Sequence, residues 1–141
     1  MLDTCIVVQY LRANPLGQYI ERTYSLRSRA ETPLISIVTH GELLSLVQQL
    51  HWGQAKQDHL QEILHEFVVV DISHQEILDR YAEIDTYTRN LPSGSRKMGK
   101  NDLWIAATAS VANAYLLTTD NDFDPLGGNF LKLVKMDLTS T

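Results

Sequence analysis

Acidic residues recur directly after predicted strands or at the start of predicted helices. Asp3 precedes the helical segment 6–11, and Glu42 opens the helix that follows the strand 34–37. Asp102 begins a further helix, and Asp120 follows the strand 115–118. Parallel α/β sheets bind ligands outside the carboxyl ends of their strands, so these four carboxylates could converge on one edge of a sheet.

Four converging carboxylates would need protons or cations to balance their charge. Two carboxylates about 4 Å apart repel each other by roughly 4 kcal/mol at an effective dielectric near 20. Their hard oxygen atoms suit Mg²⁺ or Mn²⁺, bound as one or two ions. Beside a phosphate, such an ion would position a water molecule, lower its pKa and neutralise charge on the leaving oxygen. The acidic pattern therefore favours chemistry on a phosphate group.

Basic residues are concentrated just before Asp102. The formal net charge of −5 does not by itself suggest a nucleic-acid-binding protein. Residues 86–100, however, contain four basic residues and no acid. Among them Lys100 has the best position to hold an RNA phosphate, two residues before Asp102, and Arg96 and Lys97 are further candidates. A solvated loop explains Arg96 and Lys97 nearly as well.

The elements that must position these residues alternate between strands and helices. The strand candidates are short and apolar or β-branched, as expected for a parallel sheet covered on both faces. They comprise residues 34–37, 67–70, 115–118 and 131–134. Helical periodicity lies between them, so the predicted fold class is α/β, with a mainly parallel central sheet.

Length and composition restrict the class of protein further. The 141 residues suit one domain, residues 1–141, and no apolar run approaches the 18 residues of a membrane-spanning helix. The N-terminus has no basic region, so it is not a secretory signal. A single cysteine, Cys5, excludes an internal disulfide and a cysteine-rich zinc site. These features predict a cytoplasmic protein.

Each acid also has a purely structural explanation. Glu42 could complete a capping box with Thr39, and Asp102 could be only a helix cap. Asp120 could cap the turn that follows it, and Asp3 could be a disordered terminal residue. Taken one at a time these explanations are sufficient, but together they do not explain why several strand-following positions are all acidic.

Four segments in order along the chain carry a resemblance to a known family. They are Leu2-Asp3-Thr4, Gly41-Glu42-Leu43, the nine residues 101–109 (Asn-Asp-Leu-Trp-Ile-Ala-Ala-Thr-Ala) and the seven residues 117–123 (Leu-Thr-Thr-Asp-Asn-Asp-Phe). With these segments the sequence resembles a PIN domain, and more narrowly the VapC type, the toxin of a bacterial toxin–antitoxin pair. The resemblance covers nearly the whole chain.

The resemblance implies a small α/β/α domain with Mg²⁺- or Mn²⁺-dependent endoribonuclease activity. By motif, Asp3 and Asp102 would be the most direct metal ligands, and Glu42 and Asp120 would hold a second metal or order water. Asp122 would be auxiliary, and the hydroxyl of Thr118 would support the acidic cluster. The resemblance also implies a homodimer and inhibition by an antitoxin protein that occludes the site.

Two departures from the family pattern leave alternatives open. Cys5 stands where the family usually has Asn or Ser, and a weak thiol donor there would position the acids less well. Only two residues precede Asp3, too few for an average strand. A catalytically impaired PIN-like module that binds RNA or antitoxin is therefore the main alternative. A phosphoacceptor regulator is less favoured because Asp3 stands alone after its strand.

Overall fold

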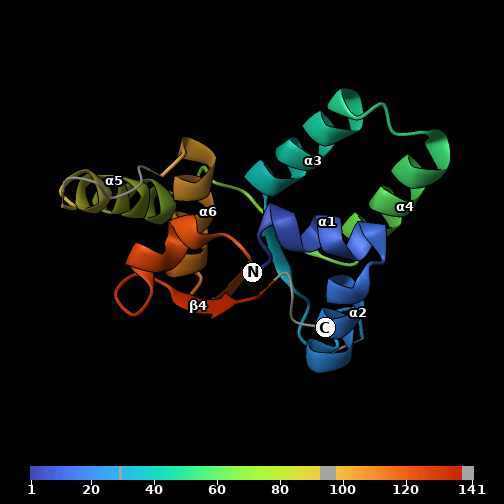
Figure 1. Cartoon of the computed structure of the whole chain (residues 1–141). Coiled ribbons are helices and arrows are strands. Elements are labelled where there is room, and N and C mark those ends of the chain that lie inside the picture. Colours follow the sequence, from blue (N-terminus) through green and yellow to red (C-terminus); the bar gives the residue numbers. More distant parts are fainter. Residues whose placement is uncertain (29, 93–97, 138–141) are drawn as a thin grey trace.

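Helices and strands alternate along the chain, as the sequence predicts. The computed structural model describes residues 1–28, 30–92 and 98–137 (Figure 1). The elements are α1 (Thr4–Arg12), α2 (Pro15–Tyr24), β1 (Leu34–Ser36), α3 (Ile37–Gln49), α4 (Gln54–His65), β2 (Val68–Val70), α5 (Gln75–Arg89), α6 (Lys100–Val111), β3 (Tyr115–Thr118), the 3₁₀ helix η1 (Asn121–Leu126) and β4 (Lys132–Lys135). The bounds of all four predicted strands agree with these to within one residue.

The N-terminal residues join two pairs of parallel strands. β1 pairs with β2, and β3 pairs with β4. Between the pairs, the amide of Leu2 donates to the carbonyl of Leu34 at 2.8 Å, and the amide of Asp3 donates to the carbonyl of Leu117 at 3.0 Å. Leu2 and Leu117 also form a parallel bridge. Residues 1–3 thus lie between β1 and β3, in the centre of the sheet, although the sequence suggested that this segment is too short for a strand.

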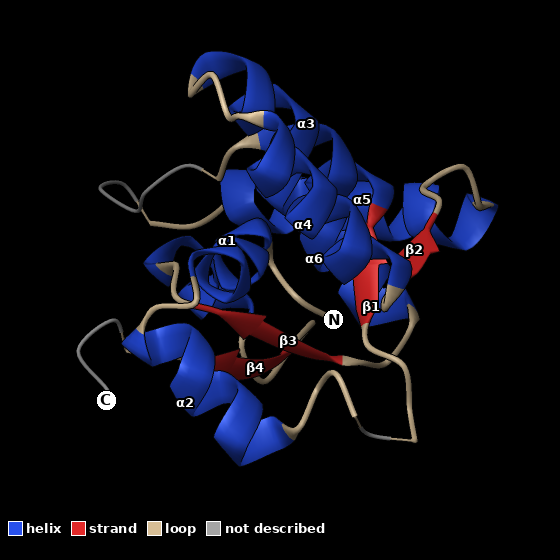
Figure 2. Cartoon of the chain, turned by 90° about the vertical axis from the view of Figure 1, so that its right-hand side faces the viewer, coloured by secondary structure: helices blue, strands red, loops and turns tan. Residues whose placement is uncertain are grey.

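Helices cover both faces of the sheet. In Figure 1, α1 to α4 lie on one side of the N-terminal residues, and α5 and α6 lie on the other. Figure 2, turned by 90°, shows β1 beside β2 and β3 beside β4. Leu117 belongs to the core cluster beneath α1 to α4, whereas its neighbour Leu116 belongs to the cluster beneath α5 and α6. Successive strand side chains point to opposite faces, so one short strand contributes to both cores. The α/β/α architecture confirms the predicted fold class.

The helix starts differ from those suggested by the capping patterns. Ser36 is the N-cap of α3, and its hydroxyl accepts from the amide of Val38 at 3.1 Å. Glu42 therefore lies within α3 and does not form a capping box. Gly99 is the N-cap of α6, so Asp102 lies in the first helical turn and is not the cap. In both cases an earlier helix start places the acid inside the helix.

None of the helices in the described part of the chain is long and apolar enough to cross a membrane.

Candidate metal centre

Three carboxylates lie close enough together to share one metal ion. Asp102, Asp120 and Asp122 each offer an oxygen atom, and these oxygens lie within 4.8 Å of one another. Asp102 comes from the first turn of α6, Asp120 follows β3, and Asp122 lies in η1. The family resemblance predicts only an auxiliary role for Asp122, but the structure places one of its oxygens within 4.8 Å of those of Asp102 and Asp120. Its position after Asp120 in the same motif was the available signal.

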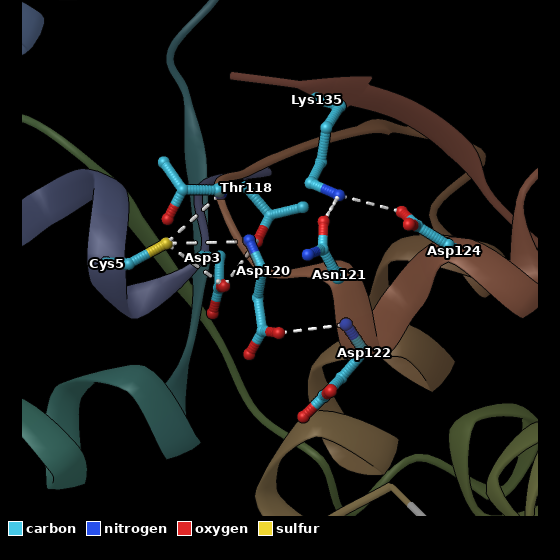
Figure 3. Close-up of polar contacts among 9 residues, drawn as sticks. Asp3, Cys5, Thr118, Asp120, Asn121, Asp122, Asp124 and Lys135 are labelled. Atoms are coloured by element: carbon cyan, nitrogen blue, oxygen red, sulfur yellow. Dashed lines mark hydrogen bonds and ion pairs between the residues drawn. The ribbon is translucent and has the colours of Figure 1, made fainter. Parts of the chain in front are cut away.

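Asp3 lies beside this triad as a buried carboxylate held by three donors. Its Oδ2 accepts from the hydroxyl of Thr118 at 2.7 Å and from the thiol of Cys5 at 3.3 Å (Figure 3). Its Oδ1 accepts from the amide of Thr4 at 2.7 Å. Only 5% of Asp3 is exposed. Burial raises the pKa of Asp3 above its ordinary value, while the hydrogen bonds from Thr118, Cys5 and Thr4 act in the opposite direction.

Glu42 is connected to Asp3 through Thr4. The hydroxyl of Thr4 donates to Oε1 of Glu42 at 2.7 Å, while the amide of the same residue binds Asp3. Thr4 thereby fixes an acid on α3 relative to the acid at the end of the N-terminal segment. The sequence pattern predicts no role for Thr4, although this residue directly follows Asp3 in the motif that carries the family resemblance.

Thr118 connects Asp3 to Asp120. Its hydroxyl donates to Asp3 and accepts from the amide of Asp120 at 2.9 Å. Asp120 in turn caps η1, because its Oδ1 accepts from the amide of Asp122 at 2.8 Å. Capping and a place in the acidic cluster are thus compatible for Asp120. The completely buried Thr118 sets the position of two acids at once.

The carboxylates repel one another strongly enough to favour a bound proton or cation. The pKa of Asp102 is raised to about 7, first by burial and then by the negative charges of Asp3, Asp120, Glu42 and Asp122, in that order. Asp3 and Glu42 are therefore electrostatically part of the centre, although they lie outside the close triad. An all-oxygen donor set with excess negative charge fits a hard divalent cation such as Mg²⁺ or Mn²⁺.

Cys5 contributes a neutral donor to this arrangement. Its sulfur donates to Asp3 and accepts from the amide of Thr119 at 3.4 Å. Burial, followed by the charge of Asp3, raises the pKa of the Cys5 thiol to about 11 from an ordinary value of 9.0. The thiol is therefore protonated at neutral pH and can donate its hydrogen bond to the Asp3 carboxylate.

We predict that Cys5 is unreactive in the folded protein. A pKa near 11 in place of 9.0 lowers the thiolate fraction at pH 7 by about a hundredfold, and only the thiolate is the nucleophile. The rate of reaction with a disulfide reagent should therefore be at least about a hundredfold lower in native protein than in urea-unfolded protein. Equal rates in the two states would contradict the thiol position described here.

The predicted basic residues are only partly described. Arg96 and Lys97 lie outside the described residues. Lys100 is exposed as the first residue of α6. A further cation, Lys135, pairs in register with Thr118 at the carboxyl end of β4. The sequence offered a signal for Lys135, because this residue directly follows the predicted strand 131–134.

Lys135 is held close to the acidic edge by two side chains of η1. Its Nζ forms an ion pair with Oδ1 of Asp124 at 2.9 Å and donates to Oδ1 of Asn121 (Figure 3). Asn121 stands between Asp120 and Asp122 in sequence. Lysine has three N–H donors, so these two contacts leave one donor available to a phosphate.

Comparison with known proteins places this arrangement in a family. The model of the PIN domain matches residues 1–129. The chain belongs to the PIN domain family. The matched segment contains all five acids of the centre. The match confirms the resemblance found in the sequence. A comparison with curated proteins gave no match.

Chains in solved VapBC structures have the same fold. A chain of the VapBC2 complex from Rickettsia felis, bound to a DNA fragment of its promoter, is 27% identical with a TM-score of 0.80, covering 97% of this chain and 98% of that one. A chain of VapBC-1 from nontypeable Haemophilus influenzae is 22% identical with a TM-score of 0.74, covering 96% of each chain. A chain of VapBC-5 from Mycobacterium tuberculosis is 20% identical with a TM-score of 0.70, also covering 96% of each. The Rickettsia felis neighbour together with the family match confirms the VapC-type resemblance, and the other two neighbours show the same fold.

Proposed function

We propose that this PIN domain is a VapC-type toxin that hydrolyses RNA phosphodiesters with the help of Mg²⁺ or Mn²⁺. The observation that carries the proposal is the close triad of Asp102, Asp120 and Asp122, in which the pKa of Asp102 is raised to about 7. Such a cluster is costly for folding and is explained by cation binding at this edge.

The acids of this chain would bind metal in two groups. Asp102, Asp120 and Asp122 would hold one ion, and Asp3 and Glu42 would supply ligands to a second ion or orient water at the same edge. A bound Mg²⁺ or Mn²⁺ supplies a lowered pKa for water and neutralisation of charge on the phosphodiester. Thr118 and Thr4 act as positioning residues, because they fix the buried Asp3 and the half-buried Glu42 by hydrogen bonds.

The surrounding cations would hold the substrate without reading its sequence. Lys100 and Lys135 lie at the start of α6 and the end of β4, at the edge that carries the acids. Contacts from such residues to RNA phosphates position a strand across the centre. Arg96 and Lys97, just before α6, remain candidates for the same role.

The proposal includes partners for the whole protein. The neighbouring structures are toxin–antitoxin complexes. By analogy, we propose a cognate antitoxin that inhibits the chain, a homodimer as the functional assembly, and a cytoplasmic location.

The impaired binding module is the competing function. This alternative arose because only two residues precede Asp3 and because Cys5 stands where the family usually has Asn or Ser. Residues 1–3 lie in the centre of the sheet, and the thiol of Cys5 donates to Asp3. Both observations support the catalytic function over the binding module.

Metal-dependent cleavage of RNA is the direct test. We expect purified protein to cut a mixed RNA pool in Mg²⁺ or Mn²⁺ and to leave it intact in EDTA, with cleavage restored when the metal is returned. An Asp58→Asn variant, altered at an exposed carboxylate of α4, should cut as the unaltered chain does. An intact pool under every metal condition would contradict the proposal and favour the binding module.

A further inference from the structure

A hollow adjoins the metal centre along α3. We call it the α3 hollow; it is lined by α3 between Val38 and Gln49 and closed by Thr4 and Asn101, with a volume of about 540 Å³. Glu42 lines it, so the hollow begins at an acid of the centre. Its volume lies within the range of sites that bind small organic ligands.

The lining residues form one stripe on α3. Val38, Glu42, Ser45 and Gln49 are separated by four, three and four residues, the spacing of a single helical face. With a rise of about 1.5 Å per residue, the stripe extends about 10 Å along the helix from Glu42 to Gln49. Nε2 of Gln49 donates to the hydroxyl of Ser45 at 2.9 Å, so these two polar groups are already oriented. Along α3, Ser45 follows Glu42 by three residues and Gln49 follows it by seven.

Gly41 leaves the wall of the hollow open. A glycine inside a helix costs about 1 kcal/mol relative to alanine. The described part of the chain does not require it, because a Cβ atom at Gly41 would meet no atom there within 4 Å. The α3 backbone is therefore accessible at the residue directly before Glu42. A close approach of a ligand to this backbone would account for the glycine.

We propose that the α3 hollow takes the base of a single-stranded RNA nucleotide next to the bond that is cut at the metal centre. The proposal rests on the proposed function. Ser45, Gln49 and Asn101 provide hydroxyl and amide groups, which suit hydrogen bonds to the edges of an unstacked base. Val38 and Leu46 offer apolar contact to its face. Among the described residues that line the hollow, only Glu42 is charged, which favours a neutral base over a phosphate or a charged peptide.

Two substitutions test the hollow in different ways. Gly41→Leu fills it, and we expect unchanged or higher thermal stability, unchanged Mn²⁺ affinity and about tenfold lower kcat/KM on a random RNA pool. Gln49→Ala removes one polar group, and we expect the preference for one base beside the cut to fall about fivefold. Gln48→Leu and Gln48→Ala are the matched controls, because Gln48 is an exposed neighbour that does not line the hollow. Both should match the unaltered chain.

The outcomes separate the inference from the proposed function. Unaltered cleavage and base preference in both Gly41→Leu and Gln49→Ala would overturn the inference while leaving the nuclease intact. Normal cleavage by Gly41→Leu with weakened antitoxin binding would identify the hollow as a protein-binding site. This result would also overturn the inference that the hollow takes an RNA base. If the unaltered chain does not cut RNA at all, the proposed function fails. RNA binding, measured by fluorescence anisotropy, then decides the inference, which requires weaker binding by Gly41→Leu than by Gln48→Leu.

Discussion

Replacing Asp102 by asparagine is expected to raise the thermal stability of the metal-free protein while removing its RNA cleavage. The carboxylate of Asp102 is disfavoured by burial and by four neighbouring acids, and its pKa of about 7 lies above its ordinary value of 3.8. Its ionised form therefore costs stability at and above neutral pH, and an amide removes that cost. A metal ion supplies several kcal/mol of transition-state stabilisation, and about 1.4 kcal/mol corresponds to a factor of ten. We therefore expect cleavage to fall at least about a hundredfold.

The pH dependence of stability provides a second measurement of the same group. A carboxyl group whose pKa is raised by folding binds more protons in the folded than in the unfolded state between the two pKa values. Through Asp102, the metal-free protein should lose stability as the pH rises from about 4 to about 7. Thermal melts in EDTA should show this slope, and Asp102→Asn should reduce it.

The outcome that would contradict this assignment is specific. The Asp58→Asn control should leave the slope, the melting temperature and Mn²⁺ affinity as in the unaltered chain. If Asp102→Asn lowers the melting temperature in EDTA, the carboxylate is not destabilising. Wild-type cleavage by Asp102→Asn would remove Asp102 from the metal centre.

Replacing Thr118 by valine is expected to destabilise the protein and disrupt the acidic centre at once. Valine has nearly the shape of threonine, but it leaves Asp3 without its 2.7 Å donor and the amide of Asp120 without its acceptor. Leaving a buried polar group unsatisfied costs about 1–3 kcal/mol. We expect the free energy of unfolding in urea to fall by about 2–6 kcal/mol, since two groups are affected.

Thr118→Ser separates the hydroxyl from the methyl group. Serine keeps both hydrogen bonds, so cleavage should remain close to that of the unaltered chain, with a loss of stability of about 1 kcal/mol from the missing methyl group. Thr118→Val should lose most of its cleavage even at temperatures where it is fully folded. Equal cleavage by the valine and serine variants would show that the hydroxyl does not position the acids.

The alternation of elements could be predicted from the sequence because it depends on local patterns. Short apolar or β-branched runs identified all four strands to within one residue, and the acids after them indicated the candidate functional edge. The helix starts were less accurate. Capping residues recur within a few positions of each other, and only packing decides whether α3 begins at Ile37 or at a later residue.

The role of residues 1–3 could not be predicted from their number. Strand propensity is averaged over several residues, and this segment has only three. Its place depends on the carbonyl of Leu34 and on both backbone groups of Leu117, which come from distant parts of the chain. Once those partners flank it, a three-residue segment can lie in the centre of the sheet and place Asp3 at its carboxyl end.

The sequence by itself determined which residue types are available for chemistry, the α/β order of the elements and the family resemblance. The tertiary structure alone decided which carboxylates share a site: Asp122 joins Asp102 and Asp120, and Asp3 and Glu42 lie alongside. It also revealed the α3 hollow and the accessible backbone at Gly41. Repulsion between carboxylates, burial and open volume all depend on distances between side chains on separate elements, and those distances exist only after the sheet has brought the elements together.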